Sequence, residues 1–259
     1  FENCMLKDAK HNITLSEYCV ERTNFEFERL QHEYNMSCFT DKCAGVATAW
    51  ARKIKNPDEI VNLLEKQGMQ LKIISQEEEG EISFKAVSRS VEAENVDIKN
   101  LVVWDIGGGS FQLSTLDDNG RIHVYRGPHG AESFDKEIRD VMSKSPNQQY
   151  PFFNEQEALQ AMSYARKEYG EPILHDAILA KKLQDPNVVI IAVGGPMSKA
   201  LSEHMNFPDE TTLKNVENTI RVFTHKRTSE ISTAIFPRIQ GYFVASTQSA
   251  LLIIYGIMS

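Results

Sequence analysis

The chain has 259 residues, of which 41% are hydrophobic and 25% are charged, and this composition is ordinary for a globular protein long enough to form two domains. Its formal net charge of −8 argues against a nucleic-acid-binding surface, because the overall field would repel a polyanion. No run of about 18 apolar residues occurs, which excludes a helix that spans a membrane.

The cysteines gather in the first part of the chain, at Cys4, Cys19, Cys38 and Cys43. Cytosolic proteins usually keep thiols reduced, whereas Cys38 and Cys43 bracket a short loop that a disulfide could close in an oxidising compartment. We therefore expect a cytoplasmic protein, or a periplasmic or secreted one if these two cysteines are bonded. A zinc site that combines cysteines with His11 or His32 is a third alternative, although no Cys-x₂-Cys spacing is present.

Helices and strands alternate in the first third of the chain. Apolar residues at helical or strand spacing, together with Pro57 and Gly68 as start and stop signals, define these elements. The predicted elements are a helix over 18–34, a strand over 45–49, a helix over 59–67 and a strand over 71–74.

An acidic segment then opens a helix at residue 76. Acidic side chains in a first helical turn offset the helix dipole, and we interpret Glu77 and Glu81 in this way. A glutamate beside a glycine, at the start of a helix that follows a buried strand, can instead face a cleft and orient water as a general base. Residues 91–100 are charged and aperiodic, which indicates a linker, and we predict domains over 1–98 and 99–259.

The strongest functional signal lies in the stretch 101–116. A buried-strand pattern ends in Asp105, three glycines (Gly107, Gly108 and Gly109) and Ser110, and a second strand then begins, which predicts a hairpin with a glycine tip. Glycines can take positive φ and let N–H groups close on an anion, while Ser110 adds a donor and Asp105 can reach a divalent cation. A loose turn is the alternative, but an acid at the end of a buried strand is costly to desolvate without a partner. We therefore interpret this tip as a site for phosphate and metal.

The remainder of the chain continues the alternation, so the predicted class is α/β. Gly194 and Gly195 join a strand to a helix and form a second corner that could bind an anion, although a tight turn without a ligand fits equally well. His129, alone in a turn, is interpreted as a surface residue. The predicted elements after the hairpin are a strand over 122–125, helices over 132–142 and 154–165, a strand over 188–193, and helices over 197–205, 214–221, 229–239 and 242–258.

Four segments occur in a characteristic order: VATAWARKIKN at 46–56, ISQEEEG at 74–80, WDIGGGS at 104–110 and AVGG at 192–195. Together they resemble the exopolyphosphatase/guanosine pentaphosphate phosphatase family, and the likeness covers most of the chain. The resemblance implies a two-domain actin-like (ribonuclease H-like) α/β fold with the active site in the interdomain cleft. It also implies an acid anhydride hydrolase that uses Mg²⁺ (or Mn²⁺) to remove the terminal phosphate of polyphosphate or pppGpp. Family members often dimerise, so the resemblance allows a homodimer.

The resemblance also implies roles for individual residues. Glu79 matches the family's water-activating base and, with Asp105, would face the metal. Arg52 matches an arginine that would contact phosphate oxygens, and Thr48 lies near it in the sequence. The phosphate-binding positions are Thr48, Gly107, Gly108, Gly109, Ser110, Gly194 and Gly195.

Some family features have no counterpart in this sequence. The resemblance implies a first strand with an Asp-x-Gly-Ser/Asn-x-Ser phosphate loop before Phe1 and a closing strand after the last helix. We therefore expect a trimmed form of a longer protein, and the alternative is a protein that lacks this half of the phosphate site. Gly195-Pro196 stands where the family usually has Gly-Thr. Two other functions stay open: a non-catalytic actin-like sensor of nucleotide or phosphate, and a nucleoside triphosphate diphosphohydrolase, which the three consecutive glycines disfavour because that group tends to have Gly-Gly-Ala.

Overall fold

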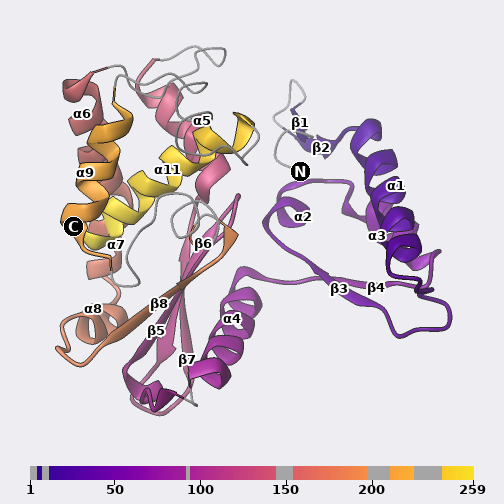
Figure 1. The fold of residues 1–259 in the computed structure, drawn as a ribbon, viewed down its shortest axis with the longest axis horizontal. Coiled ribbons are helices and arrows are strands. Elements are labelled where there is room, and N and C mark those ends of the chain that lie inside the picture. The colour runs from indigo at the N-terminus through magenta and orange to yellow at the C-terminus, as the bar shows by residue number, and fades with distance from the viewer. Residues whose placement is uncertain are drawn as a thin grey trace. The chain divides into compact units, whose positions relative to one another are not determined.

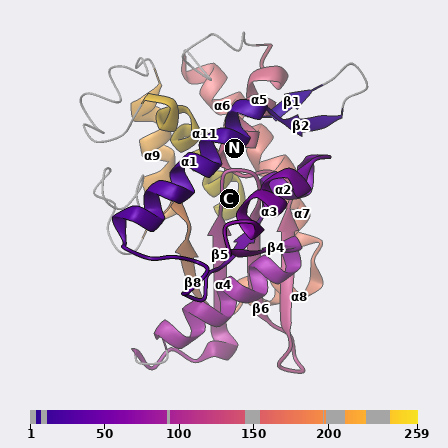
Figure 2. The ribbon, with the colours of Figure 1, turned by 90° about the vertical axis from the view of Figure 1, so that its right-hand side faces the viewer.

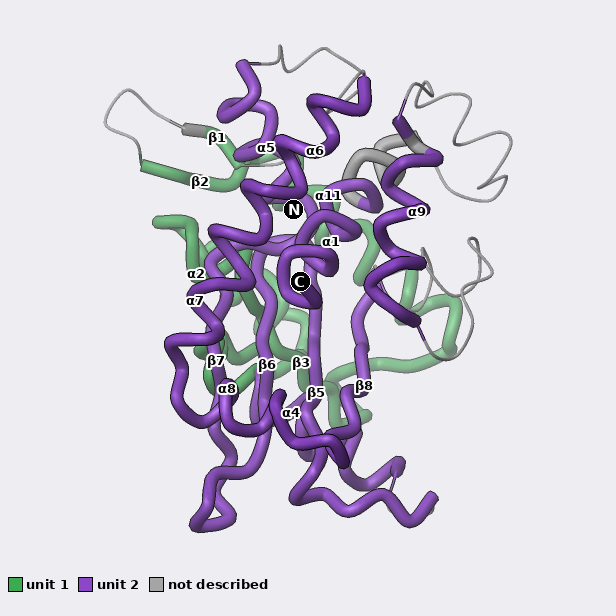
Figure 3. Tube along the Cα trace, turned by 90° about the vertical axis from the view of Figure 1, so that its left-hand side faces the viewer, with its two compact units in different colours: residues 1–79 green, residues 80–259 purple. Residues whose placement is uncertain are grey.

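A computed structural model of the chain describes residues 5–7, 12–91, 94–143, 154–195, 197, 211–224 and 241–259. The protein has two compact units, Phe1–Glu79 and Gly80–Ser259, which Figure 3 shows in green and purple. The division falls after Glu79, within a helix. The domain boundary that we predict between residues 98 and 99 stays a prediction.

In its described residues the first unit contains two small sheets and three helices, followed by the start of a fourth helix that continues into the second unit (Figure 1). Its strands β1 and β2 pair antiparallel, whereas β3 and β4 pair parallel, with Ala47 opposite Ile73. The elements are β1 (Met5–Lys7), β2 (Ile13–Leu15), α1 (Glu17–Glu33), β3 (Ala44–Ala47), α2 (Ala49–Lys53), α3 (Pro57–Glu65), β4 (Gln70–Ile73) and α4 (Gln76–Val91).

The structure confirms three predicted elements: the helix over 18–34 is α1, the helix over 59–67 is α3 and the strand over 71–74 is β4. The predicted strand over 45–49 is shorter, since Ala49 already begins α2. Helix α2 has only five residues, too few for a helical period to be visible in the sequence. Strands β1 and β2, of three residues each, were missed for the same reason.

The second unit is built on a four-stranded sheet with the order β7-β6-β5-β8, in which β8 runs parallel to β5 and the other neighbours pair antiparallel. Its elements after α4 are η3 (Ile98–Asn100), β5 (Leu101–Ile106), β6 (Phe111–Leu116), β7 (Ile122–Gly127), α5 (Ala131–Val141), α6 (Glu155–Ala165), the π-helical η4 (Arg166–Gly170), α7 (Glu171–Leu174), α8 (Ala177–Leu183), β8 (Val189–Val193), α9 (Leu213–Phe223) and α11 (Gly241–Met258).

The two faces of this sheet pack against different helices (Figures 1 and 2). Leu101 and Val103 of β5 share a buried cluster with Phe84 of α4. The even-numbered residues of the same strand belong to a larger cluster with α5, α6, α9 and α11. This unit therefore has three layers, and the alternation along β5 assigns every side chain of the strand to one face or the other.

Most predictions for the second half are confirmed, including the α/β class, the strands and the helices α5, α6, α9 and α11. The helices predicted over 197–205 and 229–239 lie essentially outside the described residues. Segments η4, α7 and α8 were not predicted. No helix among the described residues has the length and apolar character needed to cross a bilayer.

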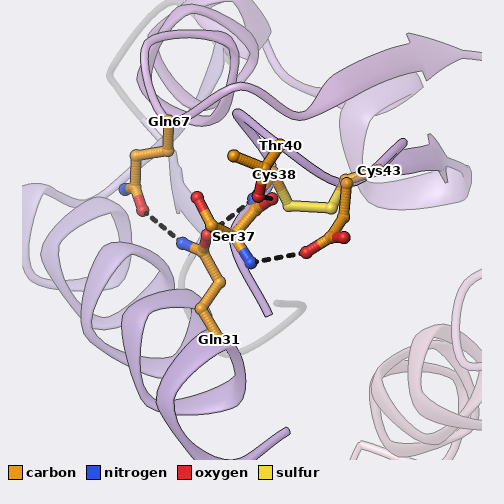
Figure 4. The surroundings of a disulfide bond; sticks show 7 residues. Gln31, Ser37, Cys38, Thr40, Cys43 and Gln67 are labelled. Atoms are coloured by element: carbon orange, nitrogen blue, oxygen red, sulfur yellow. Dashed lines mark hydrogen bonds between the residues drawn. A yellow bond between two sulfur atoms is a disulfide. The ribbon is translucent and has the colours of Figure 1, made fainter. Parts of the chain in front are cut away.

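Cys38 and Cys43 form a disulfide with Cα atoms 5.1 Å apart, and it closes the turn directly before β3 (Figure 4). The turn is tied to α1 because the Cys38 N–H donates to Gln31 Oε1 over 3.1 Å. Cys19 is also disulfide-bonded. The zinc alternative is therefore wrong for these three cysteines, because zinc is bound by thiolates and not by disulfide sulfurs.

Candidate functional site

The predicted glycine hairpin is present between β5 and β6. Ile106 and Phe111 form the last pair of the two strands, and the Gly107 N–H donates to the Ser110 carbonyl over 3.0 Å across the tip. Asp105 is the penultimate residue of β5 and is partly buried. The hairpin therefore places the acid and the glycine loop next to each other, as predicted.

The N-terminus of α5 orients the backbone of this loop. The N–H of Ala131 donates to the Gly107 carbonyl over 2.9 Å, and the N–H of Glu132 donates to the Gly108 carbonyl over 2.9 Å. In a trans peptide the carbonyl and the following N–H point in opposite directions. The N–H groups of Gly108 and Gly109 therefore point away from α5, which is the orientation an anion-binding loop needs.

The reason that glycines are needed here differs from the one we expected. Gly107 and Gly108 do not use the positive φ that is open to glycine. The close approach instead involves Gly130, where an added Cβ would lie 2.3 Å from the Gly107 carbonyl oxygen and 2.6 Å from the Ser110 nitrogen. The sequence did not reveal Gly130 as a residue of the site, because strands β6 and β7 separate it along the chain from Gly107.

The end of β8 contributes Gly194 to the same place. Strands β5 and β8 pair in parallel with Asp105 opposite Val193, so the residue after Val193 lies beside the end of β5. Gly194 has a φ of +104°, and an added Cβ would lie 2.3 Å from the Ile106 oxygen and 3.1 Å from Asp105 Oδ1. The structure therefore brings the second glycine corner to the acid. Gly195 is exposed, and nothing lies within 4 Å of the position its Cβ would take.

Two polar residues of the sheet and α4 support this group, and neither was predicted. Gln112, only 1% exposed, donates from Nε2 to Ser110 Oγ over 3.2 Å. Ser83 of α4 donates from Oγ to Asp105 Oδ2 over 2.5 Å. The sequence signal for Gln112 is a polar residue inside a buried strand. For Ser83 the signal is a hydroxyl four residues after Glu79, on the same face of a helix.

Thr48, Arg52 and Glu79 lie in the first unit. Thr48 follows β3, and its carbonyl accepts the Arg52 N–H over 3.2 Å. The Arg52 guanidinium donates from Nη1 to the Ile74 carbonyl over 3.0 Å and from Nη2 to Glu79 Oε2 over 2.9 Å. These residues thus follow the carboxyl ends of two parallel strands, where open α/β sheets commonly bind ligands.

The Arg52–Glu79 ion pair is partly shielded from water, with side chains 21% and 19% exposed. The arginine is held at two points, so it fixes the orientation of the glutamate at the first turn of α4. The structure therefore joins the predicted base and the predicted phosphate-contacting arginine.

The predicted Mg²⁺ fits the donor atoms that are present. Among the described residues no three His, Cys, Asp or Glu side chains cluster in the manner of an all-protein metal cage. Magnesium ions in phosphoryl-transfer sites usually bind through one or two carboxylates, water and the substrate phosphates. Asp105 has Oδ2 bonded to Ser83 and Oδ1 beside Gly194, and it can supply such a carboxylate.

His129 has a structural role next to the glycine loop. Its Nε2 lies 2.7 Å from Glu137 Oε2, and Tyr164 donates to the other oxygen of Glu137. Burial by itself would raise the pKa of Glu137, but the hydrogen bonds from His129 and Tyr164 outweigh it and hold that pKa below its ordinary value.

We expect this carboxylate to make stability depend on pH on the acid side. Because the pKa of Glu137 is lower in the folded state, its contribution is complete above the ordinary pKa of an unfolded glutamate and is lost as the pH falls through the lower folded-state pKa. Thermal unfolding of the wild type and of Glu137→Gln, measured between about pH 6 and pH 3, checks this. The difference in midpoint should shrink toward acid pH, since glutamine does not titrate, and a constant difference would contradict the prediction.

Comparisons with known proteins give one family. The sequence profile of the Ppx/GppA phosphatase family matches residues 15–174. No curated protein sequence matches this chain.

Solved structures agree in fold. The Aquifex aeolicus member of the Ppx/GppA protein family is similar with a TM-score of 0.64 and 20% sequence identity, over 94% of this chain and 74% of that one. An exopolyphosphatase from Cytophaga hutchinsonii gives a TM-score of 0.65 and 15% identity, over 95% of this chain and 76% of that one. These likenesses show the fold and confirm the predicted α/β class.

Proposed function

The chain belongs to the Ppx/GppA phosphatase family, and from this premise we propose that it is a phosphohydrolase that releases the terminal phosphate of inorganic polyphosphate or pppGpp. The observation that carries the proposal is the hairpin tip, where the carbonyls of Gly107 and Gly108 are bonded to α5, the following N–H groups point away from that helix, and Asp105 lies two residues before the loop. This arrangement supports binding of a phosphoryl group close to a carboxylate that can hold a cation.

In the proposed reaction, water attacks the terminal phosphorus and the shortened polyphosphate leaves. Glu79 would orient that water and accept its proton, with Arg52 holding the carboxylate in place and contacting phosphate oxygens. In the loop from Gly107 to Ser110, the N–H groups of Gly108 and Gly109 and the Ser110 hydroxyl would donate to the phosphoryl oxygens, with Thr48, Gly194 and Gly195 as further phosphate-binding positions.

A Mg²⁺ or Mn²⁺ ion bound through Asp105, with Glu79 as a second carboxylate, would neutralise charge on the phosphates as they react. The protein's net charge of −8 makes such local neutralisation necessary, because the overall field repels a polyanionic substrate.

A phosphate-release assay on the full chain tests this function. We expect orthophosphate from long-chain polyphosphate or pppGpp in the presence of Mg²⁺ or Mn²⁺, and none with EDTA. Binding of these substrates without release would favour the non-catalytic sensor. Faster release from ATP and ADP than from polyphosphate would favour a nucleoside triphosphate diphosphohydrolase.

The Cys38–Cys43 disulfide supports a periplasmic or secreted location over the cytoplasm. Intracellular thiol systems keep most cysteines reduced, whereas a disulfide persists in an oxidising compartment. A homodimer stays a prediction from the family resemblance.

A further inference from the structure

The backbone of helix α4 at Gly80 packs closely against side chains of the sheet, and this contact fixes the position of the helix along the strands. An added Cβ at Gly80 would lie 2.5 Å from a methyl group of Val124 and 2.8 Å from Ser114 Oγ. The Ser114 hydroxyl also donates to the Gly80 carbonyl over 3.1 Å. These two contacts restrict both sliding and rotation of this part of the helix.

Ser83 lies one turn after Gly80 and therefore on the same side of the helix. The next residue, Phe84, is 3% exposed and packs in the cluster that contains Leu101 and Val103 of β5. Asp105 follows these two residues on the same face of the strand, since side chains alternate along it. The apolar packing of α4 thus brings the Ser83 hydroxyl to the carboxylate.

The hydrogen bond between them has the geometry of a charge-assisted contact. The distance from Ser83 Oγ to Asp105 Oδ2 is 2.5 Å, within the range of about 2.5 to 2.7 Å for a hydroxyl on an ionised carboxylate. An ionised carboxylate only accepts, so the serine must be the donor.

This bond decides which way the second carboxylate oxygen points. The terminal torsion of an aspartate is broad and has no strong intrinsic preference. With Oδ2 bonded to Ser83, Oδ1 is directed to the side where Gly194 lacks a Cβ, 3.1 Å from the position that atom would take. Without the serine hydroxyl the carboxylate could rotate.

We propose that Ser83 is a positioning residue, whose hydroxyl fixes the Asp105 carboxylate so that Oδ1 is presented to a divalent cation. The proposal rests on the proposed function, because it concerns the same acid and the same cation. Ser83 acts through Asp105 and does not itself touch the substrate.

The chain offers a matched control on the same helix. Ser88 donates from Oγ only to the Lys85 carbonyl of its own helix over 3.2 Å, so Ser88→Ala removes a hydroxyl from α4 without touching the sheet. Ser83→Ala removes the bond to Asp105, whereas Ser83→Thr keeps a hydroxyl. Urea unfolding of all three variants shows whether each one folds.

Mn²⁺ is the probe, and its dissociation constant is measured from the electron paramagnetic resonance signal of the free ion, alongside kcat and KM for polyphosphate. Outer-shell partners of metal ligands typically contribute about 10- to 100-fold in affinity or activity, and we expect a loss of this size for Ser83→Ala. Ser83→Thr should restore most of the affinity, and Ser88→Ala should match the wild type.

Equal Mn²⁺ affinity in Ser83→Ala and wild type would overturn the proposal, and so would an equal loss in Ser88→Ala or a wild-type protein that binds no Mn²⁺. Absence of phosphate release by the wild type is a separate result. It would overturn the proposed function, while a Mn²⁺ affinity that depends on Ser83 would still support the role of the serine.

Discussion

Replacing Glu79 by glutamine is expected to lower kcat for phosphate release by a factor of about 10² to 10⁴, the usual contribution of a general base. The amide oxygen of glutamine can still accept from Arg52, which now lies 2.9 Å from Glu79 Oε2. The variant should therefore keep the fold of the first unit, while it loses the capacity to accept a proton and the carboxylate charge that we propose for the metal. Phosphate release and urea unfolding measured on the same preparation check both expectations.

Glu81→Gln is the matched control for this variant. Glu81 lies on the same helix and pairs with Lys85 over 2.9 Å, with side chains 39% and 57% exposed. Exposed pairs with this spacing contribute only about 0.3 to 0.5 kcal/mol, so stability should change little and kcat should not change. A Glu79→Gln protein that is as active as Glu81→Gln would remove Glu79 from the mechanism.

Gly130→Ala is expected to damage both stability and activity. Its new Cβ would lie 2.3 Å from the Gly107 oxygen and 2.7 Å from the Gly108 carbonyl carbon, and both of these atoms belong to the backbone of the glycine loop. Overpacking of this kind costs about 1 to 3 kcal/mol, and we expect the upper end because no flexible side chain can move aside. Displacing the loop by about 1 Å should lower kcat/KM about 10²-fold.

Gly120→Ala separates this steric effect from backbone strain. Gly120 has a φ of +76° in the turn between β6 and β7, but nothing lies within 4 Å of the position its Cβ would take. Strain at positive φ costs about 1 to 2 kcal/mol, so this variant should lose stability and keep full activity. By contrast, Gly130 has an ordinary φ of −112°. If Gly130→Ala has the same urea unfolding midpoint as the wild type and retains full activity, Gly130 does not pack against the glycine loop as closely as we describe.

Much of the fold could be predicted because its signals are local. Asn154 was expected to open a helix, and its side chain accepts the Glu157 N–H at the start of α6. Pro57 begins α3 for an equally local reason, since its fixed φ suits a first turn. Elements of three to five residues, such as β1 and α2, were missed because their sequences are too short to show a period.

The candidate site was predictable in its chemistry and less so in its construction. Asp105 and the glycine run were recognisable because an acid followed by three glycines is an unusual way for a buried strand to end. Gly107 and Gly108 do not use the positive φ that is open to glycine, since the hairpin closes with a hydrogen bond from Gly107 to Ser110 and with further hydrogen bonds from α5. The positive φ lies instead at Gly194, where glycine adopts it without strain.

The sequence by itself determined which residues can carry phosphate chemistry and on which face of β5 Asp105 must lie, because backbone preference and strand alternation act over a few neighbouring residues. Only the tertiary structure decided that Ser83, 22 positions before Asp105, would donate to it, and that Gly130 would lie against the glycine loop. Such contacts depend on how a helix packs on a sheet, and a shift of one residue in that packing would direct a different side chain to the carboxylate.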